Sequence, residues 1–122
     1  MSRTDPDNPA RPAPGSVLCA LDEIASPGAR GFRFRADEAV FAGFVVRRGE
    51  AVFGYVDRCP HMGVPMAQQL DQYLTPDGSL IACSWHSALF RIDTGECVGG
   101  PCTGQRLTPW PVAVAEGQIV TA

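Results

Sequence analysis

Four residues with metal-binding side chains stand in two short pairs along this sequence of 122 residues. Cys59 and His61 are separated by one residue, and Cys83 and His86 are separated by two. Thiolate and imidazole are the ligands that proteins use for zinc and for iron–sulfur centres. Each pair supplies one sulfur and one nitrogen. Two such loops facing each other would suit a two-iron cluster, with both cysteines on one iron and both histidines on the other.

The segment that carries these pairs, residues 58–103, is rich in residues that form turns. It contains four of the five cysteines, both histidines and a strong turn signal at residues 75–78. Short strands are expected at residues 80–83 and 88–92. Such a segment is dominated by loops and needs something other than apolar packing to order it. We therefore expect a loop-rich insert around the two pairs.

The residues on both sides of this insert follow the two-residue period of β-strands. Residues 32–36 alternate between apolar and charged side chains, which is typical of a half-buried strand. Two apolar runs, residues 40–46 and 51–56, are joined by a turn that contains glycine, and they indicate a hairpin. Further strands are expected at residues 17–21, 112–114 and 119–121. No helical period continues for three turns, so the sequence predicts an all-β domain.

The first 16 residues differ in composition from the rest of the chain. They contain four prolines and few apolar side chains, so they cannot bury enough surface to offset the entropy of folding. We expect a disordered, proline-rich tail at residues 1–16 and one domain at residues 17–122.

Charge and hydropathy exclude several classes of partner. Acidic residues outnumber basic residues by 13 to 10, which gives a net charge of −3 and argues against nucleic acid or an anionic membrane. No apolar run reaches the roughly 20 residues of a membrane helix, and no secretion signal is visible. We therefore expect a cytoplasmic protein, in which cysteines are more often ligands than disulfides.

The two pairs resemble the cluster motifs of the Rieske [2Fe–2S] proteins, and the likeness extends beyond the four ligands. Residues 86–90 resemble the second cluster loop of that family, and residues 93–95 resemble the turn that follows it. Residues 99–101 resemble the proline loop that covers the cluster, and residues 107–112 resemble the return strand. The resemblance covers about residues 17–122.

This resemblance implies a Rieske-type antiparallel β-sandwich base that carries a loop-rich cluster-binding subdomain at about residues 58–103. It also implies one [2Fe–2S] cluster as the cofactor. Cys59 and Cys83 would bind the inner iron, and His61 and His86 would bind the outer iron near the surface.

Four positions depart from the respiratory members of the family. Those proteins carry a disulfide between the cluster loops, where this chain has Val64 and Trp85. They also place hydroxyl groups near the cluster sulfurs, at positions that here are Ala88 and Phe90. Hydrogen-bond donors to the sulfurs stabilise the reduced cluster. We therefore expect a potential towards the lower end of the Rieske range of about −150 to +300 mV.

Other features of the insert leave two readings each. Cys97 and Cys102 bracket the proline loop and could form a redox-sensitive disulfide, or they could be two small buried thiols. Ser87 stands where the family usually has glycine, and it would be strained if that position needs a positive φ. The extra residues 72–78 could shape a surface for a partner, or they could be a tolerated excursion.

For function, the resemblance implies one-electron transfer from a flavin-dependent reductase to a terminal oxygenase, an aromatic-ring-hydroxylating dioxygenase. The sequence offers no recognisable set of nucleophile, base and orienting residue, and no second metal site. It ends at Ala122, whereas oxygenase subunits of the family continue into a long catalytic domain. We expect an electron-transfer component that is not catalytic alone, and a monomer that makes weak, transient contacts.

Two other functions fit parts of the pattern. The extra cysteines and the long loop could belong to a redox-sensing or regulatory Rieske protein that has no dedicated oxygenase partner. The four ligands could also hold a structural zinc ion. Zinc loops usually place paired ligands two to four residues apart and lack the proline loop, so the sequence favours the iron–sulfur cluster.

Overall fold

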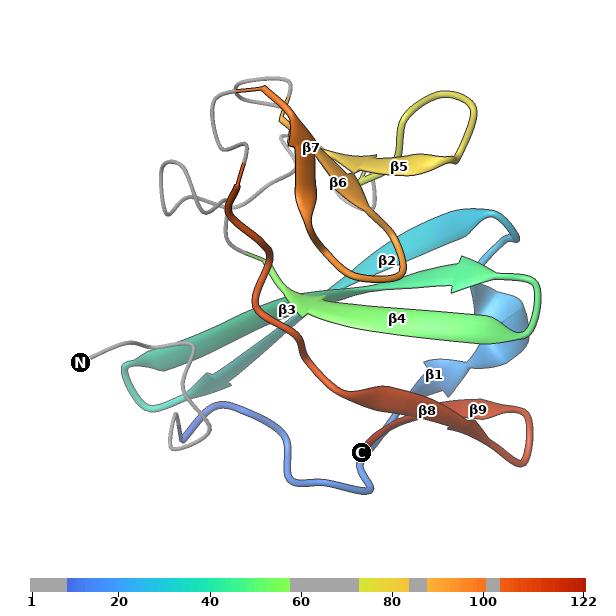
Figure 1. Cartoon of the computed structure of the whole chain (residues 1–122). Coiled ribbons are helices and arrows are strands. Elements are labelled where there is room, and N and C mark those ends of the chain that lie inside the picture. Colours follow the sequence, from blue (N-terminus) through green and yellow to red (C-terminus); the bar gives the residue numbers. More distant parts are fainter. Residues whose placement is uncertain (1–8, 58–72, 84–87, 101–103) are drawn as a thin grey trace.

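The computed structural model describes residues 9–57, 73–83, 88–100 and 104–122. Within these residues, nine strands form three antiparallel sheets of three strands each (Figure 1). The middle sheet has the order β2–β3–β4. Its strands are β2 (Gly28–Ala36), β3 (Ala39–Arg48) and β4 (Ala51–Val56).

The other two sheets lie on opposite sides of the middle sheet. In Figure 1 the β5–β6–β7 sheet lies above it and the β1–β9–β8 sheet lies below it. The upper sheet consists of β5 (Leu80–Ala82), β6 (Leu89–Arg91) and β7 (Cys97–Gly99). The lower sheet consists of β1 (Val17–Ala20), β8 (Val112–Ala115) and β9 (Gln118–Thr121). A single 3-10 turn, η1 (Leu21–Glu23), follows β1.

Strand β3 is buried on both of its faces. Phe44 and Val46 belong to the apolar cluster on the side of the β5–β6–β7 sheet. Phe41 and Val45 belong to a second cluster, on the side of the β1–β9–β8 sheet. Successive side chains of a strand point to opposite faces of its sheet, and a strand covered on both faces is a continuous apolar run. This explains why residues 40–46 do not alternate in polarity.

The segment that enters β8 runs along β4 and connects the middle and lower sheets. The N–H of Val56 donates to the carbonyl of Thr108 (2.9 Å), and the N–H of Trp110 donates to the carbonyl of Gly54 (2.8 Å). Trp110 is almost fully buried. Its ring packs edge-on against three phenylalanines of β2 and β3, which are Phe32, Phe34 and Phe41. Trp110 therefore fills the space between the two sheets.

Residues 9–16, which their composition assigns to a disordered tail, lie against the domain in the structure. The N–H of Gly15 donates to the carbonyl of Thr121, at the end of β9 (2.7 Å), and the Thr121 hydroxyl donates to the carbonyl of Ala13 (2.7 Å). Ala10 is buried, and the Arg11 guanidinium lies over the Phe41 ring. These contacts depend mainly on backbone groups, which composition does not reveal. The domain boundary at residue 17 stays a prediction.

The all-β class expected from the sequence is confirmed. Each strand expected outside the insert overlaps an observed strand, as do the two expected at residues 80–83 and 88–92. Strand β7 was not predicted. No helix among the described residues is long and apolar enough to span a membrane.

The close approach of β4 to the entry of β8 gives a stability prediction. A Cβ atom at Gly54 would fall on the carbonyl oxygen of Trp110, well inside van der Waals contact. We expect Gly54→Ala to lower the free energy of unfolding by about 1–3 kcal/mol, the usual cost of overpacking. Urea denaturation followed by circular dichroism would measure this loss.

Gly99→Ala is the matched control, because the nearest atom of the described residues to a Cβ atom at Gly99 lies 3.6 Å away, in Leu89. An equal loss of stability in the two variants would contradict the packing described for Gly54.

Candidate metal centre

Of the four predicted ligands, the structure describes Cys83. Cys59, His61 and His86 lie outside the described residues. Among the residues that are described, no three His, Cys, Asp or Glu side chains come together in a group that could hold a metal ion. The structure therefore describes the residues that flank the segments with the predicted ligands, 58–72 and 84–87. We call these flanking residues the stems of the segments, and Cys83 belongs to one of them.

Cys83 directly follows β5 and is only 1% exposed. It belongs to the apolar cluster that contains Phe44, Ala88 and Phe90. Its backbone N–H donates to the carbonyl of Ala88 (2.9 Å), so the residues on either side of segment 84–87 are hydrogen-bonded to each other. The thiol is thereby held at the base of a closed loop, away from bulk water.

The two residues that flank segment 58–72 are also bonded to each other. The Tyr73 hydroxyl donates to Asp57 Oδ2 (2.8 Å), and both residues are buried. The sequence does not predict this pair. An acidic residue at the end of an apolar strand, two residues before Cys59, was the available signal. Its pairing with a tyrosine 16 positions later leaves no trace in the sequence.

The stems of the two ligand segments touch each other. The carbonyl of Tyr73 accepts a hydrogen bond from the N–H of Ala82 (2.8 Å), the residue before Cys83. The chain that emerges from segment 58–72 is therefore bonded to the strand that leads into segment 84–87. Cys59 and His61 lie in the first of these segments, and His86 lies in the second.

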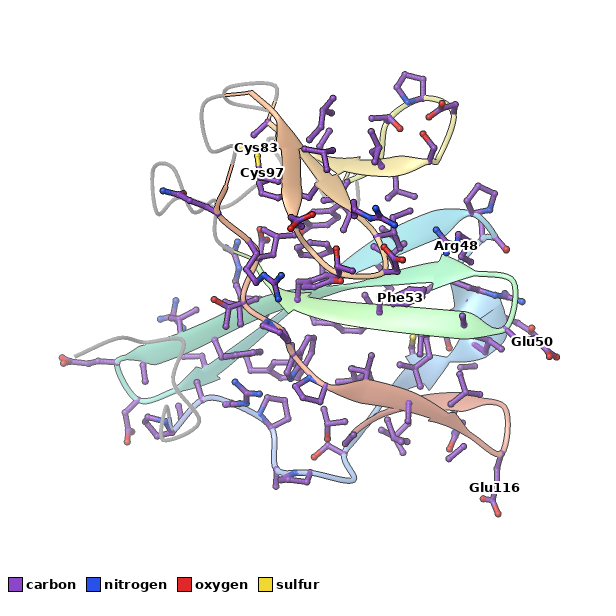
Figure 2. The ribbon with its side chains drawn as sticks, in the orientation of Figure 1. Arg48, Glu50, Phe53, Cys83, Cys97 and Glu116 are labelled. Carbon is purple, nitrogen blue, oxygen red and sulfur yellow. The ribbon has the colours of Figure 1, made fainter. Side chains whose placement is uncertain are left out.

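A third stem belongs to the segment with the expected proline loop. Cys97 is buried in the same apolar cluster as Cys83, and Figure 2 shows both at the same end of the β5–β6–β7 sheet. The Cys97 Sγ lies 3.1 Å from the carbonyl oxygen of Gly99, and the Cys97 N–H donates to the carbonyl of Gln105 (2.9 Å). Because Ala82 and Gly99 both pair with Leu89, the stems that lead into segments 84–87 and 101–103 leave the same end of this sheet.

The sequence of the chain also matches a known family of proteins. The model of the Rieske [2Fe-2S] domain matches residues 16–116. The chain belongs to the Rieske [2Fe-2S] domain family.

Two curated relatives and one solved structure are similar over most of their lengths. The ferredoxin component of the p-cumate 2,3-dioxygenase system of Pseudomonas putida is 34% identical, over 84% of this chain and 80% of its own. The 3-phenylpropionate/cinnamic acid dioxygenase ferredoxin subunit of Photorhabdus laumondii is 31% identical, over 84% and 88%. A structure titled as the complex of reduced oxygenase and oxidized ferredoxin in carbazole 1,9a-dioxygenase matches with a TM-score of 0.67 at 26% identity, over 87% of this chain and 90% of that chain.

The donor set of this Rieske chain fits a [2Fe–2S] cluster. Two thiols and two imidazoles are the ligands that a Rieske centre requires, and the buried position of Cys83 suits a ligand of an iron shielded from water. The assignment of the four individual ligands stays a prediction. So does the pairing of Cys97 with Cys102, because Cys102 lies outside the described residues. Val64, Trp85 and Ser87 also lie outside them.

The turn expected at residues 93–95 is held against the middle sheet by Tyr55. The Tyr55 hydroxyl donates to the carbonyl of Ile92 (2.6 Å). Burial raises the pKa of Tyr55 to about 12, and the negative charge of Asp93 adds to this shift. Gly95 has φ 75°, and a Cβ atom there would lie 2.7 Å from the Tyr55 ring. Tyr55 thus secures the β6–β7 turn and not the ligand stems.

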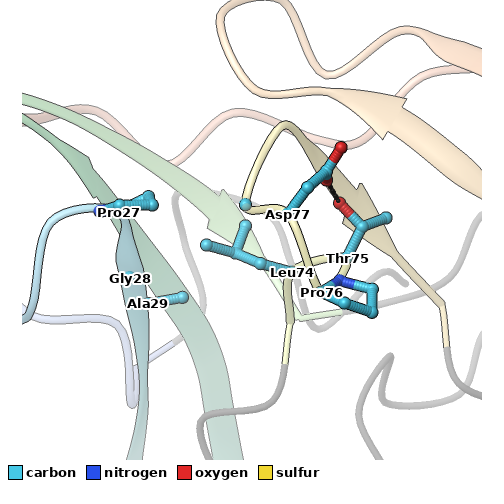
Figure 3. Close-up of a pocket in the computed structure, with 8 residues that line it drawn as sticks. Pro27, Gly28, Ala29, Leu74, Thr75, Pro76 and Asp77 are labelled. Carbon is cyan, nitrogen blue, oxygen red and sulfur yellow. Dashed lines mark hydrogen bonds between the residues drawn. The ribbon is translucent and has the colours of Figure 1, made fainter.

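The loop at residues 74–78, which the sequence left as either a partner surface or a tolerated excursion, borders a cleft with Pro27 and Gly28 (Figure 3). The cleft has a volume of about 320 Å³. Its one ionisable side chain, Asp77, bonds within its own loop, where Asp77 Oδ1 accepts from Thr75 Oγ1 (2.6 Å) and from Ser79 Oγ (2.8 Å). This geometry favours the tolerated excursion.

Asp77 gives a prediction on acid stability. Hydrogen bonds from the Thr75 hydroxyl, and then from Ser79, lower the pKa of Asp77 from 3.8 to about 2. A lowered pKa in the folded state stabilises the fold above about pH 4, and this stabilisation is lost as the pH falls towards about 2. We expect Asp77→Asn to unfold at lower urea concentration than the wild type at pH 7, with the difference closing towards pH 2.

Glu50→Gln is the control for this series. Glu50 is an exposed carboxylate at the β3–β4 turn (Figure 2), and among the described residues its side chain accepts no hydrogen bond. Its urea midpoint at pH 7 should equal that of the wild type. A gap between Asp77→Asn and the wild type that stays constant from pH 7 to pH 2 would refute the role given to the carboxylate.

Proposed function

We propose that this chain is a one-electron carrier of an aromatic-ring-hydroxylating dioxygenase system. It takes electrons from a flavin-dependent reductase, passes them to a terminal oxygenase and catalyses no reaction alone. The observation that carries this proposal is that this Rieske chain is 34% and 31% identical, over most of their lengths, to two ferredoxin components of dioxygenase systems. The complex of oxygenase and ferredoxin in the carbazole system supports the choice of acceptor.

The proposed ligands divide the work of holding the cluster. Cys59 and Cys83 would hold the inner iron, and His61 and His86 would hold the outer iron, from which the electron would leave. When bound, the cluster stores one electron at a time. Two observations on Cys83 support this assignment. Its side chain is shielded from water, and the hydrogen bond from its N–H to the carbonyl of Ala88 fixes the backbone that carries it.

Two apolar residues beside Cys83 support a low potential. Ala88 and Phe90 are fully buried and belong to the same apolar cluster as Cys83. They exclude water and carry no hydroxyl that could donate to a cluster sulfur. Because such donors stabilise the reduced cluster, we propose a potential towards the lower end of the Rieske range.

The cellular setting follows from the cysteine chemistry. Ligand cysteines must be available as thiolates, which suits the reducing cytoplasm. We propose a cytoplasmic monomer with one Rieske domain at residues 17–122 and the cluster-binding subdomain at about 58–103.

The first test is the metal content of the anaerobically purified chain. We expect two irons and two acid-labile sulfides per chain, and a Rieske-type EPR signal after reduction with dithionite. The reduced protein should then pass electrons to an aromatic-ring dioxygenase. One zinc without sulfide or colour would overturn the proposal.

A pair of cysteine variants tests the site. Cys83→Ser should lose the cluster, seen as loss of iron, sulfide and EPR signal. Cys19→Ser should retain all three. Cys19 is also buried, but it lies in the apolar cluster on the far side of the middle sheet, and burial raises the pKa of its thiol. Equal retention of iron by both variants would exclude Cys83 as a ligand.

Cys97→Ser separates the carrier from the redox sensor. A carrier should keep its midpoint potential when Cys97 is replaced, under both oxidising and reducing conditions. A reversible shift of that potential in the wild type alone would favour the sensor.

A further inference from the structure

We propose that Tyr73 is a positioning residue for the cluster, and that it fixes the stems of the two ligand segments relative to each other. This inference rests on the ligands proposed above. Tyr73 makes one hydrogen bond to each stem. Its hydroxyl bonds to Asp57, which comes two residues before Cys59, and its carbonyl bonds to Ala82, which comes one residue before Cys83.

The Asp57 side of this link is anchored in the middle sheet. The backbone N–H of Asp57 donates to the carbonyl of Ala42 in β3 (2.9 Å), and the preceding residue, Val56, bonds to Thr108 (2.9 Å). Asp57 is only 9% exposed. The carboxylate that accepts the Tyr73 hydrogen bond therefore belongs to a residue whose backbone is bonded to the middle sheet, so the link relates Tyr73 to that sheet.

The middle sheet is shaped to receive Tyr73. The Tyr73 ring stacks on Phe44, with ring centroids 4.3 Å apart and planes 6° apart. Gly31 of β2 lies opposite Phe44 in the β2–β3 register. A Cβ atom at Gly31 would lie 2.5 Å from the Tyr73 hydroxyl. The absence of a side chain at Gly31 therefore leaves the space in which the hydroxyl reaches Asp57.

The hydrogen bond between Tyr73 and Asp57 is better suited to fixing the position of the stems than to raising the stability of the whole domain. A hydrogen bond to a charged group is stronger and more directional than one between neutral groups. Phenylalanine at position 73 would keep the ring stacking on Phe44 and lose the hydrogen bond from the hydroxyl to Asp57. Residues that orient metal ligands typically change metal affinity by about 10–100-fold when they are replaced.

Tyr55 provides a matched control within the same apolar cluster. Tyr55 and Tyr73 both pack against Phe44, both are 4% exposed, and each hydroxyl donates one hydrogen bond. The Tyr55 hydroxyl bonds to the carbonyl of Ile92 in the β6–β7 turn, and not to a ligand stem. Tyr55→Phe therefore removes the same atom from the same cluster without touching the link.

The experiment compares the wild type, Tyr73→Phe and Tyr55→Phe as full chains loaded with the cluster. Cluster loss is timed by absorbance after addition of an iron chelator, and the EPR spectrum of each reduced protein is recorded. We expect Tyr73→Phe to lose the cluster about tenfold faster than the wild type and to give a broadened EPR signal. Tyr55→Phe should match the wild type in both, even if urea unfolding shows an equal loss of stability in the two variants.

Two further variants test the geometry independently. Gly31→Ala should displace the Tyr73 hydroxyl and reproduce the rapid loss of the cluster, although both hydrogen-bonding groups remain. Asp57→Asn keeps an oxygen that can accept a hydrogen bond from the Tyr73 hydroxyl. This variant should therefore lose its cluster more slowly than Tyr73→Phe.

The outcomes separate the two proposals. A wild type without iron and sulfide would overturn the proposed function. A wild type that holds its cluster, with Tyr73→Phe equal to either the wild type or Tyr55→Phe, would overturn the role of Tyr73 and leave the proposed function standing. If Tyr73→Phe does not fold, the test rests on Gly31→Ala. A Gly31→Ala variant that loses its cluster no faster than the wild type would then overturn the positioning role.

Discussion

The burial of β3 on both faces is the constraint on which the rest of the structure depends. Its side chains alternate between two apolar clusters, so one strand serves two cores at once. Phe44 faces the sheet that carries Cys83, and Phe41 faces Trp110 and the lower sheet. Because neither outer sheet has a second apolar partner among the described residues, each depends on the middle sheet for its packing. The middle sheet therefore sets the position of the stems.

Apolar packing holds both sides of the middle sheet, and hydrogen bonds add to it near Cys83. Below it, Trp110 and three phenylalanines fill the core with apolar area, which is strong but weakly directional. Above it, hydrogen bonds link Tyr73 to Asp57 and to Ala82, and the N–H of Cys83 to the carbonyl of Ala88. Hydrogen bonds specify direction and distance. The hydrogen bonds of Tyr73 and Cys83 therefore set the position of the stems that lead into the predicted ligand segments.

Sequence patterns predicted the parts of this protein that depend on local chemistry. The alternation in residues 32–36 and the apolar runs that follow specified the middle sheet, and the ligand spacing indicated the cluster. Strand β7 escaped prediction because Cys97–Gly99 is short and precedes a second glycine. The Tyr73–Asp57 bond escaped because the two residues pair through folded space, and no period connects them. The packing of residues 9–16 against the domain was not predicted, because its hydrogen bonds come from the backbone.

A buried carboxylate is a costly means of holding two segments together if stability is the only gain. Apolar residues of similar volume often serve a core as well as a buried polar pair does, and Phe44 already supplies a flat surface for packing. A packed phenylalanine has no directional contact along that surface, whereas the Tyr73 hydroxyl donates to Asp57 Oδ2 and lies in the space above Gly31. Binding sites need ligands held by supporting residues that are themselves locked in place. The hydrogen-bonded pair of Tyr73 and Asp57 lies between the middle sheet and the stems. At this junction, fixing the position of the stems matters more than burying further apolar area.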